Sequence, residues 1–370
     1  MICLLRYEWK KFLYNKKNWI VLVLILASFI GYVSFHVYEN QAYMDTKKEE
    51  FSKYRQSALY DITNMANYQS LSKTDKEKEY YANAIEYFKE VYDCANTLYQ
   101  EYASSSLQLD HLMNWNALMI QGKDNKINIV SYTRDTMEEL TKMKREYQYI
   151  KKNHISIKKT PYVCTTSNLI MNLTKNQLGF VVLILFFLWI YDVFNEFDSG
   201  AYKVLYSSGY DFKKILCSKI LFSVFLLIGY ILLFIILFGV NSCIFGIGNL
   251  EYPFSIGTRI YPESTIIIRI LLLIFGMNVF LIGVYTCISI LFKSTTRSLV
   301  IMTLLYFAVN LFQSNLKTIS NWIGFLGPNL FSMLQQKNIL LTLATDMFVL
   351  IVLLIGSTII LKKQDLIVGE

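Results

Sequence analysis

Residues Trp19 to Val37 read WIVLVLILASFIGYVSFHV, a run with no Lys, Arg, Asp or Glu. A helix needs about 20 apolar residues to cross a hydrocarbon core about 30 Å thick, so this run predicts a transmembrane helix. It is long for a signal peptide, and no small-x-small cleavage site precedes Tyr38. We therefore expect it to be retained as a membrane anchor.

The same pattern recurs along the chain, which is 54% hydrophobic and only 17% charged. Such a composition favours lipid as the solvent. The further candidate spans are Gln177 to Phe194, Ile220 to Val240, Ile270 to Phe292, Ser298 to Leu316 and Leu340 to Leu361. Asp192, Asp346 and Arg269 lie in or beside these runs near their ends, where either an interfacial structural role or a transport role is open. The sequence predicts an all-α polytopic membrane protein with about six transmembrane helices.

Basic residues orient these spans, because Lys and Arg in short loops stay on the cytoplasmic side. They gather before the first span, after the second, after the fourth and in the tail, at Arg6, Lys10, Lys11, Lys16, Lys17, Lys203, Lys213, Lys214, Lys219, Lys293, Arg297, Lys362 and Lys363. The opposite short loops offer only Arg259, Arg269, Lys317 and Lys337. Both termini are predicted to be cytoplasmic.

This orientation places residues 38–175 outside the cytoplasm, as a block long enough for a domain. Apolar residues recur there at helical spacing among Lys and Glu over 76–103 and 132–152, and less clearly over 44–62. A turn is expected at 121–125, where the sequence reads QGKDN. We expect a helical hairpin or small helical bundle.

Ahead of the first span, apolar residues alternate at helical spacing with Arg6, Lys10 and Lys11, as in a helix lying in the membrane interface. The predicted organisation is an interfacial helix (1–18), a first span (19–37), an extracytoplasmic helical domain (38–175), a second span (176–194), a cytoplasmic loop (195–219), the third to sixth spans (220–361) and a cytoplasmic tail (362–370).

Sites for catalysis, cofactors or metals are not predicted. The three histidines are far apart, the six cysteines form no CxxC pair, and no HExxH, GxSxG or DxDxDG motif occurs. Cys94 and Cys164 both fall in the outer block, where a disulfide and two free thiols remain equally open. The net charge of +8 follows from basic residues that flank apolar segments, which favours lipid headgroups over nucleic acid as partners.

Two stretches resemble the permeases of ABC-2 type ATP-binding cassette transporters. The first is the opening YEWKKFLYNKK from Tyr7 to Lys17, which is similar to the interfacial helix of that family. The second is NEFDSGAYK from Asn195 to Lys203, followed by LYSSGYDFKKI from Leu205 to Ile215 and by Lys219. It is similar to the family's acidic-x-x-x-Gly segment with a basic pair and a Lys before the third span.

The resemblance implies that this cytoplasmic loop forms a short coupling helix docked on the ATPase subunit. Its coupling residues would be Glu196, Asp198, Gly200, Tyr202 and Lys203. A loop of this length has room for a short helix across the membrane plane, with Asp198 able to cap a turn and Gly200 to end one. A plain solvated loop is the alternative.

Similar outer segments in the family form short re-entrant helices that gate the exit side. Here the matching segment lies between the fifth and sixth spans, with Gly324, Gly327 and Pro328 as the expected extracellular gate. Two glycines and a proline break any long helix. An ordinary loop is the alternative to a re-entrant helix here.

The resemblance further implies a permease subunit of an exporter in a bacterial plasma membrane, working as two copies or a related pair. No Walker A motif occurs in the chain, so a separate cytoplasmic ATPase subunit would hold ATP and Mg. The cargo would be a peptide, a lipid-linked compound or another amphipathic substrate. The large insertion between the first two spans occurs in only some members of the family, and leaves the substrate open.

Two other classes of protein remain as alternatives. A membrane-anchored sensor or assembly factor would bind a ligand with the outer domain, although six spans are more than anchoring needs. An ion-driven secondary transporter would be expected to show central intramembrane charges or an inverted repeat, and neither is evident.

Overall fold

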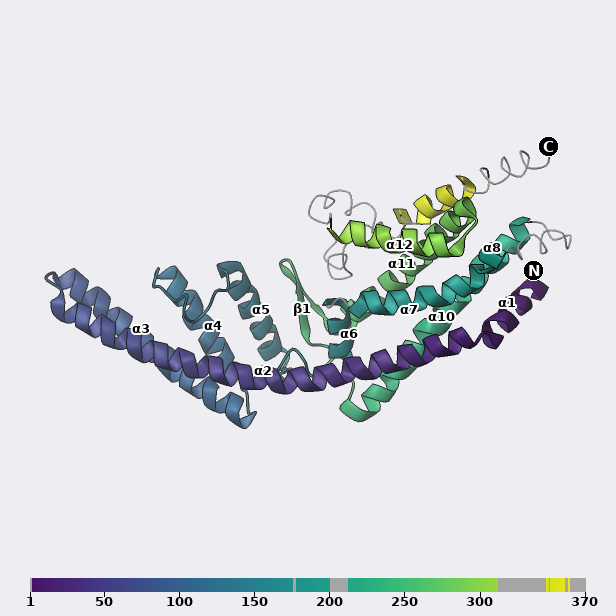
Figure 1. Cartoon of the computed structure of the whole chain (residues 1–370). Coiled ribbons are helices and arrows are strands. Elements are labelled where there is room, and N and C mark those ends of the chain that lie inside the picture. The colour runs from purple at the N-terminus through teal and green to yellow at the C-terminus, as the bar shows by residue number, and fades with distance from the viewer. Residues whose placement is uncertain are drawn as a thin grey trace. The chain divides into compact units, whose positions relative to one another are not determined.

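The protein is described by a computed structural model covering residues 2–175, 178–199, 212–311, 344–345, 347–356 and 359 (Figure 1). It divides into two compact units. One, here called the membrane unit, takes residues 1–32, 170–246 and 265–370. The other, the insertion unit, takes residues 33–169 and 247–264.

The membrane unit is built from helices, most of them apolar. They are α1 (Ile2–Tyr14), the start of α2 (Lys16–Leu71), α7 (Leu178–Phe194), the short α8 (Glu196–Ser199), α10 (Phe212–Phe245), α11 (Glu263–Phe292) and α12 (Thr295–Leu311), and residues 347–356 are also helical. Among the described residues, α2, α10 and α11 contain stretches long and apolar enough to cross a membrane. Each of the predicted spans falls on a helix wherever the structure describes it, which confirms the all-α polytopic class.

The helix α7 forms the centre of the membrane unit. It packs on α1, α10 and α12, and Phe186, Ile190 and Phe194 along it are almost fully buried. They join a core that includes Ile25 of α2 and Tyr285 of α11. At these positions α7 is covered by protein.

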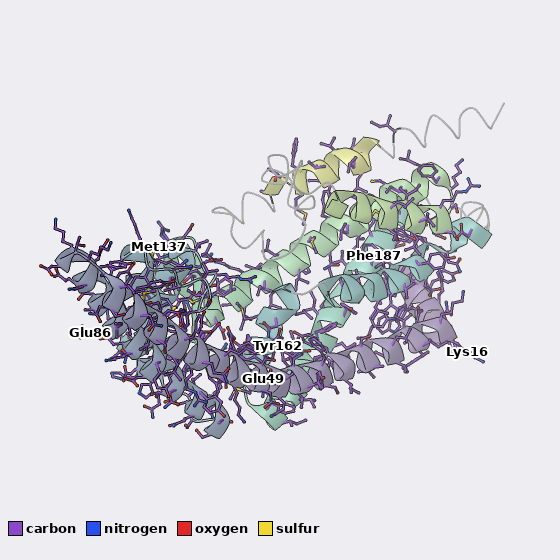
Figure 2. The ribbon with its side chains drawn as sticks, turned by 60° about the vertical axis from the view of Figure 1, so that its left-hand side comes forward. Lys16, Glu49, Glu86, Met137, Tyr162 and Phe187 are labelled. Atoms are coloured by element: carbon purple, nitrogen blue, oxygen red, sulfur yellow. The ribbon has the colours of Figure 1, made fainter. Side chains whose placement is uncertain are left out.

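The insertion unit is mainly helical, with α3 (Asp75–Ser104), α4 (Leu109–Asp124), α5 (Met137–Lys152) and the second half of α2. α3 runs antiparallel to α2 (Figure 1), since Arg55 donates to the side chain of Asn96 over 3.0 Å and the rings of Tyr68 and Tyr81 lie 5.8 Å apart. Figure 2 shows polar atoms around Glu86 and Met137 in this unit, whereas the side chains around Phe187 in the membrane unit are mostly carbon.

Local sequence sets the helix ends in this unit. Thr74 with Glu77 and Thr136 with Glu139 form capping boxes that start α3 and α5. The predicted helix over 76–103 corresponds to α3, and 44–62 lies within α2. The predicted helix over 132–152 begins too early, because Thr136 caps α5 and the helix starts at Met137. The predicted turn at 121–125 is displaced, because α4, which sequence patterns did not reveal, continues to Asp124.

A β-hairpin completes the insertion unit. Strands β1 (Pro253–Ile256) and β2 (Arg259–Pro262) pair antiparallel, with Gly257 at φ +58° in the turn. Arg145 of α5 donates to the carbonyl of Thr258 over 3.2 Å. The hairpin comes from the connection between α10 and α11, which was expected to be a short outer loop and here belongs to the same unit as residues 33–169.

A buried ion pair binds the α10–α11 connection to the rest of the insertion unit. Lys158 binds the carboxylate of Glu263, and its ammonium lies 4.4 Å from the ring centre of Tyr252. The helix α6 (Thr166–Lys175) begins nearby. The backbone N–H of its second residue, Ser167, donates to the carbonyl of Ile247 over 2.9 Å. The two parts of the insertion unit are therefore joined by side-chain and backbone contacts.

Candidate functional site

Three carboxylates lie close together in sequence where α7 ends and α8 begins. They are Asp192, Glu196 and Asp198, and we call this segment with its partners the α7–α8 junction. All three belong to the membrane unit, and each binds a different set of neighbours.

Asp192 binds the bend between α1 and α2. Its carboxylate accepts hydrogen bonds from the side-chain amides of Asn15 and Asn18, the latter over 2.9 Å. Asn15 also accepts the backbone N–H of Lys17 over 3.1 Å, and so caps the start of α2. Trp189 donates its indole N–H to the carbonyl of Asn18 over 3.2 Å. The buried carboxylate of Asp192 is thus satisfied by two amides, which link the end of α7 to the α1–α2 bend.

Glu196 lies in a buried cluster of four charged side chains. Lys219 of α10 binds Glu196, donates to Glu8 Oε1 of α1 over 2.7 Å and donates to the carbonyl of Val193 over 2.8 Å. Lys11 of α1 donates to Glu196 Oε1 over 2.8 Å. The side chains of Lys219, Glu8 and Glu196 are 4%, 4% and 5% exposed, whereas that of Lys11 is 20% exposed. Buried charges persist only when paired in this way.

The two carboxylates of this cluster differ in acidity. Burial raises the pKa of Glu8, and the attraction of Lys219 only partly offsets this. Burial acts on Glu196 in the same sense, but Lys219 and Lys11 together outweigh it and lower the pKa of Glu196. The difference arises because both lysines bind Glu196, whereas Glu8 has one close donor.

Asp198 caps the start of α12 from a distant part of the sequence. Its carboxylate accepts the backbone N–H groups of Thr295 (2.9 Å) and Thr296 (3.0 Å) and the hydroxyl groups of Ser294, Thr295 and Thr296. Partial burial opposes ionisation, but these hydrogen bonds outweigh it and hold the pKa of Asp198 below its usual range. An anionic group at a helix N-terminus also interacts favourably with the helix dipole.

Together these contacts join α8 and the end of α7 to four other helices. Asp192 reaches the α1–α2 bend, Glu196 reaches α1 and α10, and Asp198 reaches α12. A displacement of α8 would therefore act on several apolar helices at once.

Sequence reasoning identified part of this site. Glu196 and Asp198 lie at the junction, whereas Gly200, Tyr202, Lys203, Gly324, Gly327 and Pro328 lie outside the described residues. Glu8, Lys11 and Thr295 were not predicted as partners. A lysine at position 219, at the start of an apolar run, was a signal that one or more carboxylates would be found nearby.

In the described parts of the chain, no group of three or more His, Cys, Asp or Glu side chains is arranged to hold a metal ion. The chemistry that the junction offers is ion pairing and helix capping.

A family model described as ABC-2 family transporter protein matches residues 2–361. The chain belongs to the ABC-2 transporter family. No curated protein and no solved structure matches it. As an ABC-2 permease it is a multi-pass membrane component of an ABC transporter, and membership of this family implies association with an ABC ATPase subunit.

Proposed function

We propose that this chain is the permease subunit of an ABC exporter of a bacterial plasma membrane. It moves a peptide or another amphipathic substrate out of the cytoplasm or the membrane. A separate cytoplasmic ATPase subunit holds ATP and Mg, and two permeases, identical or related, form the pathway. Both termini lie in the cytoplasm, and the chain itself has no catalytic role.

The observation that carries this proposal is the family match over residues 2–361, which includes the α7–α8 junction. The junction supports a coupling role because it begins a segment that the distribution of Lys and Arg predicts to lie on the cytoplasmic face. Asp198 and Glu196 join that segment to α12, α1 and α10.

In this proposal the ATPase contacts the segment from 195 to 219 and moves it when its subunits close. Because the side chain of Glu196 is only 5% exposed, its movement acts on Lys11 and Lys219, the two lysines that bind it, rather than on the surface of the ATPase. Asp198 transmits the same movement to the start of α12. The helices tilt and open an outward route between two permeases.

Purification of the affinity-tagged permease from its host membrane tests the proposal. We expect an ATPase with a Walker A motif to copurify, and substitution Gly200→Pro to lower the ATPase activity of the complex because proline removes a backbone donor and restricts the chain. Lys363→Ala, in the predicted tail, should leave activity unchanged. Recovery of the permease without an ATPase would favour the sensor or assembly-factor alternative.

A further inference from the structure

Among the residues that the structure describes, the buried cluster at the α7–α8 junction contains one carboxylate oxygen without a hydrogen-bond donor. Glu8 Oε1 accepts from Lys219 over 2.7 Å, but Glu8 Oε2 is buried and accepts no hydrogen bond within the described part of the chain. The Glu8 side chain is 4% exposed, so bulk water does not solvate this oxygen. A buried acceptor that stays unpaired is costly, and its presence calls for an explanation.

A cationic donor lies close to this oxygen, namely Lys11, one helical turn away on α1. Lys11 Nζ lies 3.7 Å from Glu8 Oε2, beyond hydrogen-bond distance, because it is held 2.8 Å from Glu196 Oε1 and 3.3 Å from the carbonyl of Val193. Its side chain is the most exposed of the cluster, and a lysine stem is flexible. A small rotation would bring Lys11 onto Glu8.

We propose that Glu8, Lys11, Lys219 and Glu196 form a two-position latch, in which Lys11 transfers from Glu196 to Glu8 when α8 moves away from α1. The inference rests on the proposed function, since it takes the ATPase as the source of the movement. Glu8 is thereby a positioning residue, because it receives Lys11 in the state in which α8 has moved away from α1.

The charges of the cluster support two arrangements. If α8 leaves with Glu196, Lys219 keeps its bonds to Glu8 Oε1 and to the carbonyl of Val193. Lys11 then fills Glu8 Oε2, so Glu8 is paired through both oxygens and neither lysine is left without an acceptor. Without Glu8 as the receiving group, displacement of Glu196 would leave two lysines with no carboxylate. Discrete alternatives of this kind turn a small shift into a switch.

Distance measurements on the complex with its ATPase test the latch. Nitroxide labels are placed on the native Cys3, which is exposed on α1, and on Asn195→Cys before α8, with the other cysteines replaced. Pulsed electron paramagnetic resonance then compares the nucleotide-free complex with the complex trapped by ATP and vanadate. We expect trapping to create a second distance, and Glu8→Gln to reduce that population by about tenfold or more. The matched control Lys10→Gln, exposed on the same helix, should behave as the parent protein.

A second variant tests the latch independently if the Glu8→Gln protein does not fold and accumulate in the membrane. Lys11→Met removes the transferred group from a more exposed position and should also suppress the second distance. Where both single variants fold, the double variant should be no worse than either, because both remove the same interaction. Additive losses, or full retention of the second distance in either variant, would overturn the latch.

The parent complex separates this inference from the proposed function. If the ATPase copurifies and responds to Gly200→Pro but trapping leaves the distance between Cys3 and position 195 unchanged, the latch is wrong and the permease assignment stands. If no ATPase copurifies at all, the proposed function fails, and the latch fails with it.

Discussion

At the scale of single residues, the acidic side chains of the α7–α8 junction have other partners than the sequence led us to expect. Glu196 was expected at a contact with a partner subunit, and in this chain it is buried between two lysines. Asp198 was expected to cap a nearby turn, and it caps α12, which begins about a hundred positions later. Whether these residues couple ATP hydrolysis to transport stays a prediction.

Substitution Asp198→Asn should destabilise the protein by about 1 kcal/mol, because it removes the negative charge at the N-terminus of α12, where an anionic group contributes up to about that much. The effect stays modest because the residue is largely exposed. Since the pKa of Asp198 is lowered in the folded protein, its contribution is present above the unfolded carboxyl pKa of about 3.9 and is lost as pH falls through the lower folded value. The difference in melting temperature between the parent protein and Asp198→Asn should therefore be constant from pH 8 to about pH 5 and should shrink in stronger acid.

The control for this measurement is Glu79→Gln, an exposed carboxylate on α3, which should leave the melt unchanged. Equal melting of Asp198→Asn and the parent protein at neutral pH would show that the carboxylate contributes nothing to α12.

At the scale of elements, close packing brings together helices that are far apart in the sequence. α11 passes the helical residues 347–356 with Gly283 against Leu350, where an added Cβ would lie 1.7 Å from Leu350 Cδ1. Only a glycine fits this approach without a shift of the neighbouring side chain. Small residues at such positions let membrane helices come close together.

Substitution Gly283→Ala should therefore destabilise the protein by about 1–3 kcal/mol, the usual cost of overpacking. Detergent-solubilised protein can be compared in thermal melts. The matched control is Gly229→Ala in α10, which meets nothing within 4 Å and should be neutral or slightly stabilising. Gly283→Ala combined with Leu350→Ala should recover part of the loss, and failure to do so would argue against this packing.

The β-hairpin supports a second prediction at the same scale. A soluble fragment of residues 33–169 should show a helical circular dichroism spectrum. Joining residues 247–264 to it through a flexible linker should raise its melting temperature by several degrees, roughly 3 °C or more, because Glu263 then pairs with the buried Lys158. In the joined fragment Glu263→Gln should abolish the gain, whereas the exposed Glu251→Gln should retain it. A strand-dominated spectrum would refute the helical assignment.

At the scale of the whole molecule, the chain combines apolar helices with a polar insertion unit. The family match and the apolar helices establish a multi-pass membrane protein. The side of the membrane on which each unit lies follows from the distribution of Lys and Arg, and this orientation is still a prediction.

Cysteine labelling of intact cells checks the orientation. In a background without native cysteines, Lys123→Cys in the insertion unit should react with a membrane-impermeant maleimide, and Lys214→Cys on α10 should react only after permeabilisation. Lys214 is exposed and Lys123 is partly exposed in the structure, so that the membrane decides whether the reagent reaches them. The reverse result would place the α7–α8 junction outside and remove the basis for ATPase coupling.

The sequence alone determined the class of the protein, the places of its apolar helices and two of the insertion-unit helices. Each of these depends on properties that a segment carries by itself, namely its length, hydropathy and helical periodicity. Capping boxes such as Thr74 with Glu77 are local in the same sense. A segment that is apolar enough to prefer lipid does so whatever its neighbours are.

Only the tertiary structure decided which distant residues meet. Glu8, Glu196 and Lys219 form one cluster, Asp198 caps α12, and Glu263 reaches back to Lys158. Such pairs depend on which helices pack side by side, and neither periodicity nor charge counts in one sequence contain that information. A lysine beside an apolar run indicates that a carboxylate must be near, but the packing selects which one.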